Sequence, residues 1–88
     1  MRKVSMKRAI VNRLSRAQGH LTHVKEMVEE DKPLKDVLTQ LSAVTSALGT
    51  ITRELQKEEF IRQLRSKAPS LSPAEAEDVF RALLDKIF

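Results

Sequence analysis

Two long series of regularly spaced apolar residues, separated by one proline, constrain the fold of this chain more than any other feature. Both series recur at intervals of three and four, which places their members along one face of an α-helix. Because Pro33 disfavours helical geometry at Lys32, the pattern predicts two helices, at about residues 4–30 and 34–66, joined by a tight turn. The first series is Ile10, Leu14, Ala17, Leu21, Val24 and Val28, and the second is Leu38, Leu41, Val44, Leu48, Ile51, Leu55, Phe60, Ile61 and Leu64.

A third, shorter helix is predicted at about residues 73–87. Pro69 ends the second helix, and Ser72 is placed to cap the third, with Pro73 in its first position and Glu75 in its first turn. This helix also has an apolar face, made of Val79, Phe80, Leu83, Leu84, Ile87 and Phe88. The chain is therefore predicted to be all-α, a single helical domain over residues 1–88.

The length of the chain predicts an oligomer. A core built from 88 residues without cysteine yields only modest stability, and two helices of about 40 Å each cannot enclose a core between them. We expect two such hairpins to pair into an antiparallel four-helix bundle, with the third helices either covering its ends or joining dimers into a tetramer. The expected homo-oligomer is thus a dimer or a tetramer. The apolar runs are shorter than the roughly 18 residues of a membrane span, and the basic start precedes no signal-peptide core, which predicts a cytoplasmic protein.

Gly19 lies inside the first predicted helix, where glycine costs roughly 1 kcal/mol against alanine. We expect close approach of a neighbouring helix to explain it. A functional contact to its backbone is the alternative.

Charge is distributed unevenly along the chain. Residues 1–25 contain seven basic side chains and no acidic one, whereas residues 26–88 contain nine basic and twelve acidic ones. This asymmetry indicates a surface that binds a polyanion, with nucleic acid as the first candidate and an anionic membrane as the second. Three phenylalanines are the only aromatic residues, which favours duplex over single-stranded nucleic acid. The alternative is an ordinary solvated face. The candidate DNA-binding residues are Arg13 and Arg16, followed by Arg2, Lys3, Lys7, Lys35 and Arg53.

Four sequence blocks resemble a known family over roughly residues 8–65. They are residues 12–21 (NRLSRAQGHL), 27–31 (MVEED), 37–44 (VLTQLSAV) and 46–48 (SAL). Their order and spacing are similar to those of the copper-sensitive operon repressors and their nickel/cobalt- and formaldehyde-responsive relatives. The resemblance implies an all-helical dimer of hairpins that assembles into a flat tetramer, and DNA repression that is released when a ligand binds between subunits.

The ligand site implied by that resemblance is not preserved. The family's cysteine corresponds to Leu34, and its two further ligands, histidine or cysteine, correspond to Glu59 and Gln63. Cuprous ion prefers thiolate and imidazole ligands, and formaldehyde chemistry requires a thiolate nucleophile. We therefore expect none of the usual inducers to act on this chain, and its inducer remains unassigned. A cysteine-bearing paralogue that supplies the missing ligands is left open.

Two further groups of side chains are candidate metal sites. His20 and His23, with Glu26, lie one turn apart on one helix, but three ligands from a single helix are an unusual site, and an incidental or structural role is favoured. Glu58 and Glu59 are interpreted as part of a solvated face, because Lys57, Arg62 and Arg65 are near enough in sequence to pair with them. No metal or other cofactor is predicted.

The sequence leaves two functions in competition. The first is a DNA-binding transcriptional repressor of the metal-sensor-like family, which docks electrostatically on duplex DNA. The second is a helical oligomerisation or adaptor protein whose basic arm binds a protein or an anionic surface. No nucleophile–base pair, phosphate-binding loop or acid/base pair of carboxylates indicates an enzyme.

Overall fold

The computed structural model describes residues 4–87, which form three α-helices and no strand. They are α1 (Val4–Glu29), α2 (Leu34–Lys67) and α3 (Pro73–Ile87), and their ends differ from the expected ones by at most one residue. The predicted all-α class is confirmed. The chain divides into two compact units, residues 1–52 and 53–88, with α2 contributing to both. The interpretation as a single domain stays a prediction, as does the arrangement of the subunits.

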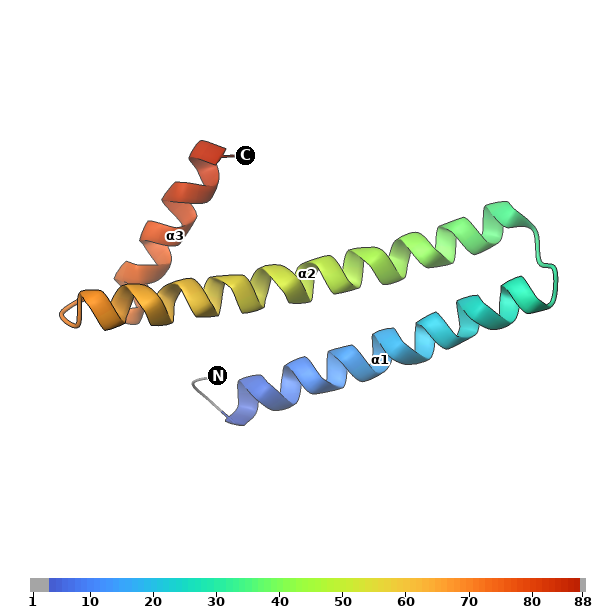
Figure 1. The fold of residues 1–88 in the computed structure, drawn as a ribbon, viewed down its shortest axis with the longest axis horizontal. Coiled ribbons are helices and arrows are strands. Elements are labelled where there is room, and N and C mark those ends of the chain that lie inside the picture. Colours follow the sequence, from blue (N-terminus) through green and yellow to red (C-terminus); the bar gives the residue numbers. More distant parts are fainter. Residues whose placement is uncertain (1–3, 88) are drawn as a thin grey trace. The chain divides into compact units, whose positions relative to one another are not determined.

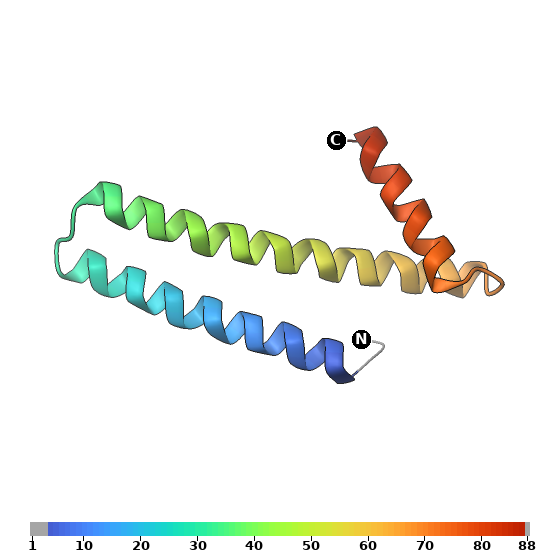
Figure 2. The ribbon, with the colours of Figure 1, turned by 180° about the vertical axis from the view of Figure 1, so that it is seen from behind.

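In the first unit, α1 runs antiparallel to the beginning of α2, as both views show (Figure 1 and Figure 2). The turn between them is built around Asp31, whose φ of 56° is left-handed. The Asp31 N–H donates to Val28 O (3.1 Å) and the Lys32 N–H donates to Met27 O (2.9 Å), which is the Schellman pattern of a helix end. Aspartate tolerates this conformation better than most residues. The chain therefore leaves α1 two residues before Pro33, whose carbonyl then accepts the first bond of α2, from Val37 N.

The core of this unit follows a spacing of seven rather than the whole predicted series. On α1 the buried residues include Ile10, Ala17 and Val24, and on α2 they include Val37, Val44 and Ile51. Met27, which the first series did not include, is also buried, and Val37 likewise lies outside the second series. A two-helix contact covers only a narrow strip of each helix, and a spacing of seven matches such a strip.

Half of the residues predicted as core are exposed within this chain. On α1 they recur every seven residues and lie beside the buried strip rather than on it. Leu21 is 47% exposed and Leu38 is 61% exposed. We call these exposed residues of the first unit, together with Leu34 at the start of α2, the apolar face, and it consists of Leu14, Leu21, Val28, Leu34, Leu38, Leu41 and Leu48.

The expectation for Gly19 was wrong as far as this chain is concerned. A Cβ built on Gly19 would meet nothing within 4 Å, so no other segment among residues 4–87 packs against this glycine. Gly19 lies on the exposed surface of α1.

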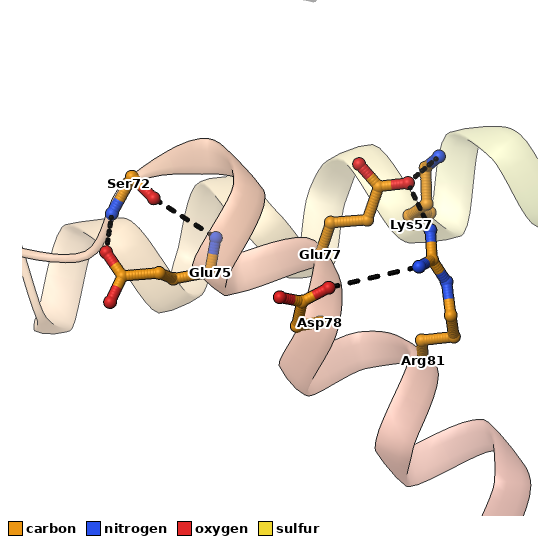
Figure 3. A network of polar contacts seen from close by, with 6 residues as sticks. All are labelled: Lys57, Ser72, Glu75, Glu77, Asp78 and Arg81. Atoms are coloured by element: carbon orange, nitrogen blue, oxygen red, sulfur yellow. Dashed lines mark hydrogen bonds and ion pairs between the residues drawn. The ribbon is translucent and has the colours of Figure 1, made fainter.

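In the second unit, α3 begins with the predicted cap (Figure 3). The Ser72 N–H donates to Glu75 Oε1 (3.0 Å), and the Glu75 N–H donates to Ser72 Oγ (3.1 Å), which is a capping box. α3 contacts the end of α2 through the rings of Phe60 and Phe80, whose centroids are 5.3 Å apart. Ile61 on α2 and Ala76 on α3 are buried.

An ion-pair network also joins the two helices of this unit (Figure 3). Lys57 Nζ of α2 lies 3.3 Å from Glu77 Oε1 of α3, and the same carboxylate oxygen lies 3.0 Å from Arg81 Nη2. No helix within residues 4–87 is both long enough and apolar enough to cross a membrane.

Candidate nucleic-acid interface

Arg13, Arg16 and His20 come together along one edge of α1, where they line a groove between α1 and α2. The buried residues Ala17 and Ile51 line it, together with the small residues Ala47 and Thr50 of α2. The groove has a volume of about 350 Å³. We call it the cationic groove, and it is lined by Arg13, Arg16, Ala17, His20, Ala47, Thr50 and Ile51.

The three basic side chains share this edge because their spacing matches the helix repeat. Positions separated by three, four or seven residues lie on one side of an α-helix. Arg13 is half-buried and Arg16 is exposed, so the first is held near the core while the second faces solvent. On α1 the nearest acidic side chain is Glu26, since residues 1–25 contain none. The groove therefore combines fixed positive charge with small side chains that leave it open.

His20 is held in place by Gln40 of α2. His20 Nε2 lies 2.8 Å from Gln40 Oε1, and since that oxygen can only accept, Nε2 carries the donated proton. This bond fixes one side of the groove across the two helices. Sequence reasoning did not include Gln40, and its position beside the core face of α2 is the only signal that could have identified it.

The histidines do not build a metal site in the part of the chain that the structure describes. No group of three or more His, Asp or Glu side chains within residues 4–87 is arranged to hold a metal ion. His23 is exposed, and the Nε2 atom of His20 is directed at Gln40.

None of the other described cationic candidates lines the groove. Lys7 is exposed on α1, nine residues before Arg16 and so roughly 180° around the helix axis from it. Lys35 is exposed in the first turn of α2, and Arg53 is exposed in the second unit. Arg2 and Lys3 lie outside the described residues. The structure thus brings two of the seven candidates together, Arg13 and Arg16.

At the positions that correspond to the family's ligands, the side chains are already engaged or apolar. Leu34 opens α2 as an exposed aliphatic side chain. Glu59 accepts hydrogen bonds from Arg62 Nε (2.9 Å) and Nη2 and from Gln63 Nε2 (3.2 Å). The bonds from Arg62, supported by the bond from Gln63, lower the pKa of Glu59 below its ordinary value. The negative charge of Glu59 is therefore already paired with the positive charge of Arg62.

The interpretation of Glu58 as part of a solvated face was wrong, because its side chain is buried with 6% exposed. It lies seven residues after Ile51 and thus continues the buried strip of α2. Of the expected cation partners, Arg62 pairs with Glu59, whereas Lys57 pairs with Glu77.

The chain matches a family model described as "Metal-sensitive transcriptional repressor" over residues 6–86. This match covers nearly all of the sequence. The chain belongs to the metal-sensitive transcriptional repressor family. The family resemblance stated from the sequence is thereby confirmed.

Curated relatives of this chain have names that refer to copper. It is 50% identical over 46 residues to the copper-sensing transcriptional repressor RicR of Mycobacterium tuberculosis, a match that covers 52% of the chain and 48% of the relative. It is 49% identical over 47 residues to the copper-sensing transcriptional repressor CsoR of Mycobacterium ulcerans, covering 53% and 40%. Against the copper-sensing transcriptional repressor CsoR of Bacillus subtilis, the identity is 30% over 76 residues, covering 86% and 72%. The chain spans about half or less of the length of the two mycobacterial relatives. No solved structure matched it.

Proposed function

We propose that this protein is a transcriptional repressor that binds duplex DNA with its cationic groove and assembles with further copies through its apolar face. Membership of the repressor family supports the regulatory role. The observation that carries the proposal is the division of one hairpin into two surfaces of different chemistry. On α1, Arg16 and Leu21 lie on either side of the buried strip, five residues and so roughly 140° apart.

The apolar face is the basis for proposing an oligomer. Seven large aliphatic residues are too many for a face left in water, since burying one such side chain contributes about 1.5–3 kcal/mol. A second hairpin presents the same face, so two copies bury it mutually in an arrangement with two-fold symmetry. This pairing gives the antiparallel four-helix bundle, and α3, with Val79 and Leu83 exposed, is available to join dimers into a tetramer.

Copper, nickel and formaldehyde are not proposed as inducers. The chain has no cysteine, and the corresponding positions hold a leucine, a carboxylate bonded to arginine, and an amide. None of these is a soft ligand for cuprous ion or a nucleophile for an aldehyde. Copper sensing is thus a property stated in the names of the relatives that we do not transfer to this chain.

The proposal is tested by fluorescence anisotropy of a labelled duplex taken from the region upstream of its own gene, over a series of salt concentrations. We expect specific binding. The logarithm of the association constant should fall linearly with the logarithm of the salt concentration, since each neutralised phosphate releases counterions. Sedimentation of the same sample should give a dimer or tetramer. An oligomer that binds no duplex in a salt-dependent manner would overturn the repressor function and favour the adaptor alternative.

A further inference from the structure

Gly19 is a helical glycine for which the chain itself provides no reason. Glycine in place of alanine costs a helix interior roughly 1 kcal/mol. Glycine is usually required at a position for one of two structural reasons. Either the backbone is left-handed, or a neighbouring group lies so close that there is no room for a Cβ atom. Neither applies, because no glycine in the described residues has a positive φ, and a Cβ at Gly19 would meet nothing within 4 Å. The remaining physical cause is close approach of another molecule.

The position of Gly19 on α1 indicates which molecule that is. Arg16 precedes it by three residues and His23 follows it by four, so both are its neighbours on the helix surface. Asn12, seven residues before Gly19, lies on the same side, and all four residues are exposed. The surface around Gly19 therefore offers hydrogen-bond donors and positive charge. On α1 the nearest acidic residue is Glu26, about 10 Å further along the axis.

A second copy docked on the apolar face would not reach this glycine. Leu21 lies roughly 160° around the axis from Gly19 and Val28 roughly 180° from it. The hairpin partner proposed above thus covers the opposite side of α1. Arg16, by contrast, lines the cationic groove and is a neighbour of Gly19 on the helix surface, so the glycine lies on the solvent side of the groove's Arg16 edge.

We infer that the α1 backbone at Gly19 is the point where a sugar-phosphate strand of duplex DNA comes closest to the protein. This inference rests on the proposed function. The missing side chain lets a phosphate lie against the helix while Arg16 and His23 donate hydrogen bonds to it from either side. A methyl group there would hold the strand away, and hydrogen bonds weaken steeply beyond their normal length. Most protein–DNA hydrogen bonds go to the phosphates and sugars and fix the register of the protein on the duplex, which makes Gly19 a positioning residue.

The experiment uses the full chain with the substitutions Gly19→Ala and Gly19→Leu. Both replace glycine by a better helix former without changing the charge. We expect both variants to unfold at a higher temperature than wild type, while affinity for the duplex falls about tenfold for alanine and further for leucine. Opposite changes in stability and in binding distinguish a contact with DNA from a structural role. Gln18→Ala is the matched control, because Gln18 is exposed, uncharged and next to Gly19 in sequence but lies roughly 100° around the axis. It should leave affinity unchanged.

Each outcome decides a specific claim. If wild type binds the duplex and Gly19→Leu binds equally well, the inference about Gly19 is wrong while the repressor function stands. The Gly19 variants could change the sedimentation coefficient and lose DNA affinity only in proportion to the change in assembly. In that case Gly19 is approached by another subunit, and the inference is again wrong. If wild type binds no duplex at all, the proposed function fails, and the inference fails with it.

Discussion

Arg13 and Arg16 are the side chains that the first unit places most favourably for a polyanion. Arg16 is exposed at the rim of the cationic groove, and Arg13 is half-buried beside Ala17. Their different burial gives them different expected roles. We expect the exposed Arg16 to contact a phosphate and the half-buried Arg13, which has fewer directions open to it, to set the register.

Replacing both residues, Arg13→Ala and Arg16→Ala, should weaken duplex binding far more than it changes helicity. Each lost phosphate contact reduces the salt slope by about 1 per bound copy, and a lost base contact costs roughly 1–3 kcal/mol. Anisotropy across a salt series and circular dichroism measure the two effects. The matched comparison is Arg16→Ala alone against Lys25→Ala, which removes the same single charge from an exposed position roughly 180° from Arg16. An equal loss from Lys25→Ala would show that net charge, not the groove, determines binding.

Two of the positions that the family resemblance assigns to ligands, Glu59 and Gln63, are hydrogen-bonded to each other on α2. Glu59 also accepts a hydrogen bond from Arg62. Wild-type protein should therefore take no copper from a strong cuprous chelator in a competition assay. The double variant Leu34→Cys, Glu59→His should gain affinity for thiophilic metals, because it restores a thiolate and an imidazole. Leu34→Cys alone serves as the comparison. Tight copper retention by wild type would contradict our assignment of these positions.

At the scale of the element, α3 depends on a small number of polar contacts at its start. The capping box joins Ser72 and Glu75, and Glu77 bridges Lys57 and Arg81 (Figure 3). The hydrogen bond from the Ser72 N–H lowers the pKa of Glu75, and the bond from Lys57 lowers that of Glu77. Both carboxylates thus stabilise the folded state only while they are ionised.

The stability of this unit should fall in acid. Because both pKa values lie below the unfolded value of 4.5, the contribution is complete above that pH and is lost as pH falls through the folded values. Helicity followed by circular dichroism from pH 6 to pH 2 measures this loss. Glu77→Gln should reduce the pH dependence, whereas Asp85→Asn, an exposed carboxylate on the same helix, is the control. If Glu77→Gln loses helicity over the same pH range as wild type, Glu77 does not contribute to the acid sensitivity.

The Ser72 cap can be tested at neutral pH. Ser72→Ala should lower the free energy of unfolding by about 1 kcal/mol, since it removes the acceptor of the Glu75 N–H. Urea unfolding followed by circular dichroism measures the change. Ser70→Ala, just before α3, provides an exposed serine as control. Equal stability of the two variants would show that the cap contributes nothing measurable.

For the whole molecule, the apolar face should decide the state of assembly. Leu21→Glu together with Leu48→Glu places charges on both helices of that face, and burying an unpaired charge is costly. We expect the variant to sediment near the monomer mass of 10.0 kDa and to lose helicity, because α1 and α2 share only a narrow strip. Ser15→Glu, exposed and roughly 120° from Leu21, should leave the oligomer intact. A monomeric wild-type protein would contradict the proposed assembly.

The sequence by itself determined the three helices and their ends. Apolar spacing, Pro33 and the Ser72–Glu75 cap act over a few residues, so they can be recognised without knowledge of the fold. That Arg13 and Arg16 share one side of α1 also followed from the sequence, because residues three apart lie on one face of a helix. Their role as DNA contacts stays a prediction. Local rules were sufficient in each of these cases.

Only the tertiary structure decided how each apolar series is divided. Leu14 and Ala17 belong to one predicted stripe, yet Ala17 is buried and Leu14 is exposed, because two cylinders touch along a narrow line. The burial of Glu58, the bond between His20 and Gln40 and the open space at Gly19 likewise depend on which residues of distant segments meet. Helical periodicity gives the direction of a side chain from its own axis. Whether that direction ends at a neighbouring helix or in solvent is set by packing, which the spacing of residues along the chain does not contain.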